Sequence, residues 1–208
     1  MKQEKWYAIR KGRKTGVFST WKEASKHVTG VSGSEYKSFP TKAAADAYVS
    51  GKPSAVETKI PNRGDRPQPN RCWAFIDGSY DVKLNRYGYG GILIYSDHQE
   101  TFYGGDSQPE LAKIRNVAGE MSAAMRAVQR AYQKQIAEIT LYYDYMGIEA
   151  WATGSWQRKN PYTQQYHDYM QKMAQGIRIV YVKVPAHTGV YYNEQADQLA
   201  KKGVYQQA

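Results

Sequence analysis

A proline-rich segment divides this sequence into two parts of unequal length. Residues 51–71 contain four of the eight prolines and almost no large apolar side chains. Such a composition does not support a packed core and is typical of a linker that proline stiffens in places. We therefore expect a small module over residues 1–50, a linker over 51–71 and a larger domain over 72–208. The length of 208 residues accommodates one average domain and one small one.

The positive charge is concentrated in front of the larger domain. Residues 1–71 contain 15 Lys or Arg and six Asp or Glu, whereas residues 72–208 contain 14 and 13. Basic surfaces attract phosphate backbones and release their counterions on binding. The charge therefore predicts a nucleic-acid partner, with most of the attraction supplied by the first 71 residues.

Three sequence features bear on the compartment. No apolar run approaches the ~18 residues that a membrane span needs, and residues 1–6 lack the apolar centre of a secretory signal. Cys72 is the single cysteine and cannot form an internal disulfide. We expect a cytoplasmic protein without membrane association.

The first part has the pattern of a small α+β module with a three-stranded sheet and two helices. Short apolar runs separated by a basic turn are typical of strands, and Thr20 and Thr41 precede helical patterns as N-caps do. The expected strands are 6–9, 16–20 and 36–39, and the expected helices are 21–28 and 42–49.

The second part has the pattern of an α/β domain. Three strands with short connections predict an antiparallel meander, and later strands that alternate with helices predict parallel crossovers. An apolar stripe from Met121 to Tyr132 predicts a helix lying on the sheet. The expected strands are 72–77, 88–95, 99–103, 139–144 and 177–184, and three further helices are expected over 147–153, 162–174 and 193–202. We expect Asn193 to cap the last helix and Gly203 to end it.

Four acidic residues occupy positions that solvation alone does not explain. Asp77 and Asp144 each end an apolar strand, Glu120 lies near a helix start beside the apolar stripe, and Asp197 lies among apolar helix residues. Taken singly, an Asp at a strand end is more often a turn former, and a Glu at a helix start interacts favourably with the helix dipole. The strand and helix order, however, predicts that these acids meet at one edge of the sheet.

Clustered carboxylates predict a bound metal. Without cations the four groups would repel one another and raise their own pKa values. Oxygen ligands without paired His or Cys favour Mg²⁺, with Mn²⁺ as a substitute. Two Mg²⁺ ions in a carboxylate site are typical of phosphoryl transfer, which indicates a phosphodiester substrate.

The second part contains five ordered motifs: Asp77-Gly-Ser-Tyr80, the segment 115–124 around Glu120, Tyr142-Tyr-Asp-Tyr145, Val184-Pro-Ala-His-Thr-Gly189 and Asn193-Glu-Gln-Ala-Asp197. With these motifs, residues 72–204 resemble type 1 ribonuclease H. The resemblance implies a five-stranded mixed sheet with flanking helices. It also implies that Asp77, Glu120, Asp144 and Asp197 hold the catalytic metals, and that His187 assists proton transfer or product release.

The first part contains the segment from Trp6 to Trp21, with its basic turn, and the later segment Tyr36-Lys-Ser-Phe39. With these segments, residues 5–50 resemble the hybrid-binding domain, also called the caulimovirus viroplasmin-like domain. In that family an exposed tryptophan and tyrosine flank the sugars of the DNA strand, and lysine contacts its phosphates. The resemblance assigns these roles to Trp21, Tyr36 and Lys37, and we expect Tyr7 to contact the substrate as well. A second lysine is common where this chain has Ser38. The alternative is that Trp21 and Tyr36 are core aromatics.

Motif position suggests further substrate contacts in the second part. Gly78, Ser79 and Asn116 are expected near the RNA 2′-hydroxyls, Arg115 near a phosphate and Trp151 on a DNA sugar. The second part departs from the family pattern at two points. The segment from Asp144 to Trp151 is shorter than usual, and the basic handle before the next helix is missing.

The sequence therefore predicts a monomeric endonuclease that cuts the RNA strand of RNA–DNA hybrids and leaves 5′-phosphate and 3′-hydroxyl ends. The main alternative is a non-catalytic protein with a nuclease-like fold that binds hybrids or double-stranded RNA. A second alternative is another nuclease of this fold, such as an integrase or a junction resolvase. The intact carboxylates argue against the first alternative, and the motif that carries Asp197 argues against the second.

Overall fold

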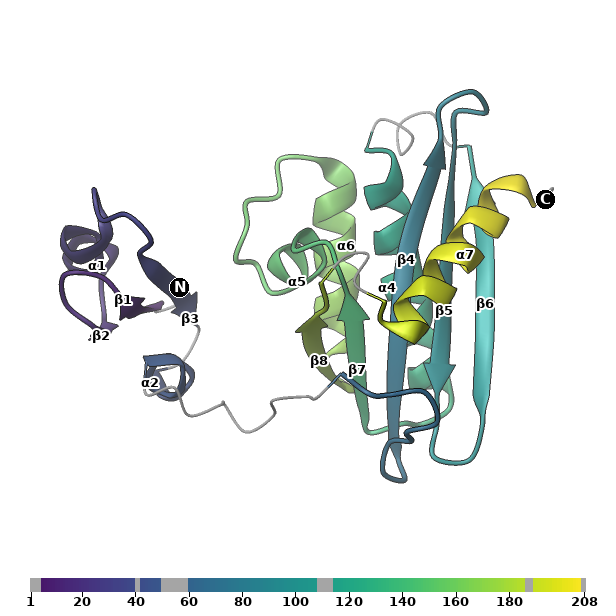
Figure 1. Ribbon diagram of the computed structural model, residues 1–208, viewed down its shortest axis with the longest axis horizontal. Coiled ribbons are helices and arrows are strands. Elements are labelled where there is room, and N and C mark those ends of the chain that lie inside the picture. Colours follow the sequence, from purple (N-terminus) through teal and green to yellow (C-terminus); the bar gives the residue numbers. More distant parts are fainter. Residues whose placement is uncertain (1–4, 40–41, 50–59, 108–113, 186–188, 207–208) are drawn as a thin grey trace. The chain divides into compact units, whose positions relative to one another are not determined.

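The structure is a computed structural model that describes residues 5–39, 42–49, 60–107, 114–185 and 189–206 (Figure 1). The chain forms two compact units, Met1–Lys59 and Ile60–Ala208. The boundary between them falls inside the expected linker of 51–71, so residues 60–71 of that linker belong to the second unit. Among the described residues, no helix is both long enough and apolar enough to cross a bilayer.

The first unit contains a three-stranded antiparallel sheet in the order β2-β1-β3, with two helices. Its elements are β1 (Trp6–Lys11), β2 (Gly16–Phe18), α1 (Trp21–Val28), β3 (Glu35–Phe39) and α2 (Lys42–Val49). Among the described residues, Ile9, Ala24 and Val28 form its small core cluster. Thr20 caps α1 because its side chain accepts a hydrogen bond from the backbone N–H of Glu23. The expected N-cap Thr41 lies outside the described residues.

The second unit contains a five-stranded mixed sheet in the order β6-β5-β4-β7-β8, which confirms the expected fold class. The strands are β4 (Arg71–Asp81), β5 (Arg86–Ile94), β6 (Gln99–Asp106), β7 (Glu138–Tyr143) and β8 (Arg178–Lys183). β4, β5 and β6 pair antiparallel as a meander. β7 pairs parallel with both β4 and β8, so β4 joins the antiparallel and parallel halves.

The two faces of this sheet carry separate cores. α4 (Asn116–Gln133) covers one face and α7 (Tyr191–Tyr205) covers the other, as Figure 1 shows. The first core contains Ala74, Ile76, Leu141 and the apolar stripe of α4 around Val128. The second contains Phe75, Ile92, Tyr142, Tyr192 and Ala196. The neighbours along β4 alternate between these cores, as expected for a strand buried on both faces.

Between β7 and β8 the chain forms the short helix α5 (Gly147–Ala152) and the longer helix α6 (Pro161–Met173). Side chains of α6 donate hydrogen bonds to carbonyl groups of α5. Tyr166 donates to the carbonyl of Ile148, and Gln171 donates to that of Ala152. A six-residue helix is unstable by itself, so the packing on α6 stabilises it.

Several of the expected element boundaries are wrong. β4 does not end at Asp77, because its antiparallel pairing with β5 continues to the pair Asp81 and Arg86. α7 begins at Tyr191 rather than after Asn193, and it passes through Gly203 to Tyr205. A Cβ at Gly203 would meet the backbone carbonyl of Gly104. Gly203 therefore permits close contact between helix and sheet and does not end the helix.

Candidate functional site

Asp77 lies just beyond the last paired residues of the parallel strands β4 and β7. The parallel pairing of β4 with β7 ends at Phe75 and Tyr142, two residues before Asp77. β4 continues beyond this point only against β5. The backbone N–H of Gly78 donates a hydrogen bond of 2.7 Å to Oδ1 of Asp77. The side chain of Asp77 is thus fixed at a gap between two strands.

Glu120 reaches this gap from the second turn of α4. A Cβ at Gly78 would meet the carbonyl oxygen of Asn116 and the backbone nitrogen of Glu120. Glycine at this position therefore allows the helix to lie against β4. Nδ2 of Asn116 lies 3.4 Å from Oε1 of Glu120 and donates a hydrogen bond to it.

Asp144 directly follows β7 and completes a group of three carboxylates. One oxygen each of Asp77, Glu120 and Asp144 lies within 4.8 Å of the others. Asp77 and Glu120 are buried, with exposed fractions of 8% and 3%, and Asp144 is half-buried. Three elements from separate parts of the sequence therefore place carboxylates at one point, where the strand and helix order predicted four.

Burial and mutual repulsion perturb the acidity of this group. Burial, and next to it the charge of Asp144, raises the pKa of Asp77 to about 7. Burial, together with the charges of Asp144 and Asp77, raises the pKa of Glu120 to about 9. Buried carboxylates of this kind are stable as anions only when cations compensate them.

The donor set fits a hard divalent cation. The three side chains offer only oxygen ligands, they converge, and the raised pKa values indicate uncompensated negative charge. Asp77, Glu120 and Asp144 are the residues that could hold such an ion. The structure therefore supports the use of a divalent metal at this point.

Asp197 lies near the group but is not part of it among the described residues. It projects from α7 and raises the pKa of Asp77 through its charge. Its Oδ2 atom lies 2.7 Å from Nζ of Lys201 in an i,i+4 ion pair. The sequence did not indicate this role for Lys201, since a lysine four residues after an acid is common on exposed helices.

The expected substrate residues of the second unit lie around the carboxylates. Gly78 contacts α4 as described, and Ser79 is the next residue of β4. Arg115 precedes the first residue of α4 and has a φ of 52°. Such a backbone is uncommon for residues other than glycine and occurs often at functional sites. His187 lies outside the described residues, and its role remains a prediction.

Trp151 belongs to an aromatic cluster that the sequence interpretation missed. Its ring centroid lies 5.8 Å from that of Tyr145 and 5.7 Å from that of Trp156. Tyr145 directly follows Asp144, and Trp156 is 42% exposed. The close spacing of three aromatics after an acid was a usable signal.

The first unit brings its predicted aromatic residues together on its surface. The ring centroid of Trp21 lies 5.5 Å from that of Tyr7 and 5.4 Å from that of Tyr36. Trp21 and Tyr36 are exposed, at 43% and 49%, so they are not core residues. Lys37 follows Tyr36 in β3. We name Tyr7, Trp21 and Tyr36 the aromatic trio.

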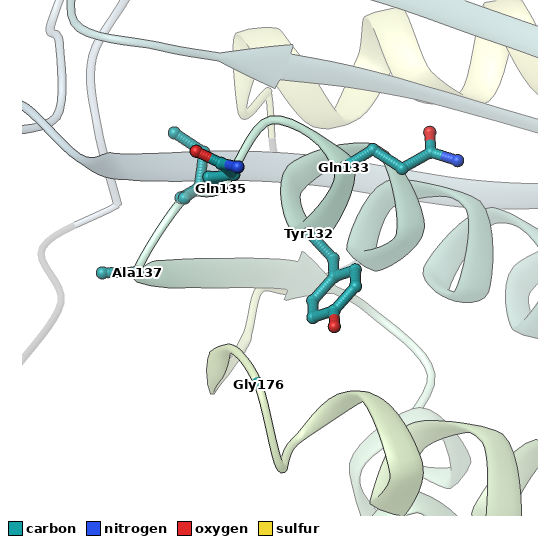
Figure 2. Close-up of a pocket in the computed structure, with 6 residues that line it drawn as sticks. Tyr132, Gln133, Gln135, Ala137 and Gly176 are labelled. Atoms are coloured by element: carbon teal, nitrogen blue, oxygen red, sulfur yellow. The ribbon is translucent and has the colours of Figure 1, made fainter.

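A pocket of about 440 Å³ lies in the second unit, at the opposite end of β7 from the carboxylate group. It is lined by residues at the end of α4, before β7 and before β8: Tyr132, Gln133, Gln135, Ile136, Ala137 and Gly176. Figure 2 shows Tyr132 directed toward the loop that carries Gly176. The pocket is at the start of β7, whereas Asp144 follows the end of that strand. It is therefore not the carboxylate site.

Sequence comparisons agree with this division of the chain. The profile described as the Ribonuclease H1 N-terminal domain matches residues 5–49, and the RNase H profile matches residues 69–205. Ribonuclease H1 of Mus musculus is 27% identical over 256 aligned positions, which cover 97% of this chain and 90% of that protein.

Two solved structures show the same fold. RNase H1 from the halophilic archaeon Halobacterium salinarum NRC-1 has a TM-score of 0.51 and 25% identity, and covers 64% of this chain and 96% of that one. LC11-RNase H1, solved in complex with an RNA/DNA hybrid, has a TM-score of 0.51 and 17% identity, and covers 64% of this chain and 96% of that one. The carboxylate group, the sheet order and the RNase H profile, which matches more than half of the chain, together show that this chain belongs to the RNase H family.

Proposed function

We propose that this protein hydrolyses the RNA strand of RNA–DNA hybrids with two Mg²⁺ ions and leaves 5′-phosphate and 3′-hydroxyl ends. The observation that carries the proposal is the group of Asp77, Glu120 and Asp144, whose oxygen atoms converge within 4.8 Å in a domain of the RNase H family. Mn²⁺ is expected to substitute for Mg²⁺, because it accepts the same oxygen ligands.

The residues of the group have distinct tasks in this proposal. Asp77, Glu120 and Asp144 hold the cations, and Asp197 contributes its charge from α7. When bound, the ions supply activation of a water and stabilisation of the leaving oxygen. The hydrogen bond from Gly78 fixes one oxygen of Asp77, and the amide of Asn116 orients Glu120. His187 is proposed, from its motif alone, to assist proton transfer or product release.

Substrate contacts are proposed on both units. Near the carboxylates, we propose that Gly78, Ser79 and Asn116 probe RNA 2′-hydroxyls and that Arg115 contacts a phosphate. Trp151 would pack on a sugar of the DNA strand, supported by its neighbours Tyr145 and Trp156. In the first unit, the aromatic trio and Lys37 would hold the hybrid, which the exposure of Trp21 and Tyr36 supports.

The decisive experiment compares cleavage of a matched RNA–DNA hybrid, double-stranded RNA and double-stranded DNA. Each substrate is incubated with Mg²⁺, with Mn²⁺ and with EDTA, and the product ends are identified. We expect cleavage of the RNA strand of the hybrid in either metal and none in EDTA. Retained binding without cleavage would instead support a non-catalytic hybrid or double-stranded RNA binder. Cutting of duplex DNA would support an integrase or resolvase activity.

A further inference from the structure

The segment between the two family matches is attached to the catalytic unit. The matched regions end at residue 49 and begin again at residue 69, so residues 60–67 belong to neither. Pro61 and Pro67 are nevertheless buried, and Ile60 packs against the core beneath α7. Figure 1 shows this segment passing the start of α7 before it enters β4. We call residues 60–67 the strap.

A tight turn within the strap presents one backbone group to α7. The backbone N–H of Asp65 donates to the carbonyl of Asn62, and Oδ2 of Asp65 accepts from the N–H of Asn62. Gly64 has a φ of +93°, which only glycine adopts readily. Its N–H donates a hydrogen bond of 3.1 Å to Oη of Tyr192.

A second contact holds the neighbouring residue of the helix. The guanidinium of Arg63 lies 4.8 Å from the ring centroid of Tyr191, which is within the range of a cation–π interaction. α7 has Val190 at its N-cap position, where no side-chain hydrogen bond caps the helix. The strap therefore anchors a helix start that lacks the usual polar cap.

Packing connects this anchor to the carboxylate group. The buried ring of Tyr192 lies 5.2 Å from that of Phe75, which stacks at 4.4 Å on Tyr142. Phe75 and Tyr142 are the last parallel pair of β4 and β7, each two residues before a carboxylate. Asp197 lies in α7 itself, within two turns of the anchor. Movement of the helix start would shift three of the four acids relative to one another.

We propose that the strap is a positioning element of the catalytic site, with Arg63 and Tyr192 as its positioning residues. It holds the first turns of α7 in register with β4 and β7. The proposal rests on the proposed function for its catalytic readout only. Its structural readout is the amide hydrogen exchange of residues 191–197, which is independent of activity.

The test uses the full chain and variants that change the strap without changing its length. Replacement of residues 60–67 by a Gly/Ser sequence of equal length should lower kcat about tenfold and leave KM within about threefold. It should also accelerate amide exchange in residues 191–197. Arg63→Ala should lower kcat about threefold, and Arg63→Lys, which keeps a cation over the ring, should restore most of this loss. Tyr192→Phe removes only the hydroxyl and should have an effect similar to that of Arg63→Ala.

Arg66→Ala is the matched control, because it also removes one positive charge from the strap. The guanidinium of Arg66 donates a long hydrogen bond of 3.4 Å to Gln99 in β6 and not to α7, so kcat should stay unchanged. Equal effects of Arg63→Ala and Arg66→Ala on KM, with kcat preserved, would reduce the strap to a source of charge and overturn the proposal. Unchanged exchange in the strap-replaced protein would overturn it as well. If the parent protein does not cleave hybrid, the proposed function fails, and the exchange measurement still decides whether the strap anchors α7.

Discussion

The two units of this chain differ in the exposure of their candidate functional side chains. The first unit exposes large aromatic residues, with Trp21 43% and Tyr36 49% accessible, beside a small core cluster around Ile9. The second unit buries carboxylates, with Asp77 8% and Glu120 3% accessible, between two extensive cores. Surface binding needs accessible rings, whereas a metal site needs converging groups on rigid elements.

Charge follows the same division. Residues 1–59 contain 12 Lys or Arg against five Asp or Glu, and residues 60–208 contain 17 against 14. A cluster of buried carboxylates repels a polyanionic substrate until cations neutralise it. The comparison indicates that attraction for nucleic acid and cleavage of nucleic acid are supplied by different units. The predictions below separate these two contributions.

The largest effect is expected from Asp77→Asn. The amide retains the size of the side chain but removes a charged metal ligand, so kcat on hybrid should fall by about a thousandfold or more. Hybrid binding, measured in Ca²⁺ or EDTA, should change little because the first unit is intact. Asp97→Asn is the control, since Asp97 is an exposed residue of the second unit. Comparable turnover by Asp77→Asn in Mg²⁺ would remove the proposed site.

The buried carboxylates should also make the metal-free protein less stable as pH rises. The pKa of Asp77 is raised from 3.8 to about 7 and that of Glu120 from 4.5 to about 9. Between about pH 4 and pH 9 the folded state therefore holds more protons than the unfolded state, and the free energy of unfolding decreases with pH. The decrease should reach a few kcal/mol in EDTA.

Urea denaturation at pH 5 and pH 8 measures this dependence. Mg²⁺ should restore most of the lost stability at pH 8 and little at pH 5, where both groups are protonated. Glu120→Gln should weaken the pH dependence because it removes one of the two titrations. An identical dependence in this variant would show that other groups cause it.

Removal of residues 1–59 tests whether the first unit supplies hybrid binding and the second unit supplies cleavage. The remaining unit keeps the carboxylates and the strap, so kcat at saturating hybrid should be preserved. The hybrid KM should rise by roughly 10- to 100-fold and depend less steeply on salt. Removal of residues 1–67 also deletes the strap, and kcat should then fall as well. An inactive protein after the shorter deletion would contradict the separation of roles.

Local sequence patterns predicted most elements because each pattern acts over a few residues. The apolar stripe of α4, the cap of Thr20 and the five strands all follow from such patterns. Boundaries that depend on distant partners were wrong or incomplete. β4 extends beyond Asp77 because β5 pairs with it, and Gly203 is inside α7 because it lies against Gly104.

The candidate site shows the same limit. The acids Asp77, Glu120 and Asp144 could be proposed from their positions at element ends, and the structure brings them together. The contact between Lys201 and Asp197 and the attachment of the strap could not be proposed from the sequence. The composition of residues 60–67 indicated a linker, yet Ile60 packs on an apolar core that includes Tyr192 and Ala196, which lie more than 100 positions away in the sequence. The linker over 51–71 and the domain boundary at 71/72 stay predictions.

The smallest effect that we predict concerns the aromatic trio. Trp21→Ala should weaken hybrid binding by the full chain about tenfold, because an exposed ring that packs against nucleic acid contributes on the order of 1–3 kcal/mol. kcat should not change, since the carboxylates are in the other unit. Tyr132→Ala is a matched control because Tyr132 is 49% exposed and lies in the pocket away from the carboxylates. Equal loss of binding in both variants would mean that exposed aromatics act nonspecifically. If only Trp21→Ala weakens hybrid binding, and the salt dependence of binding is unchanged, then the first unit contributes stacking in addition to charge.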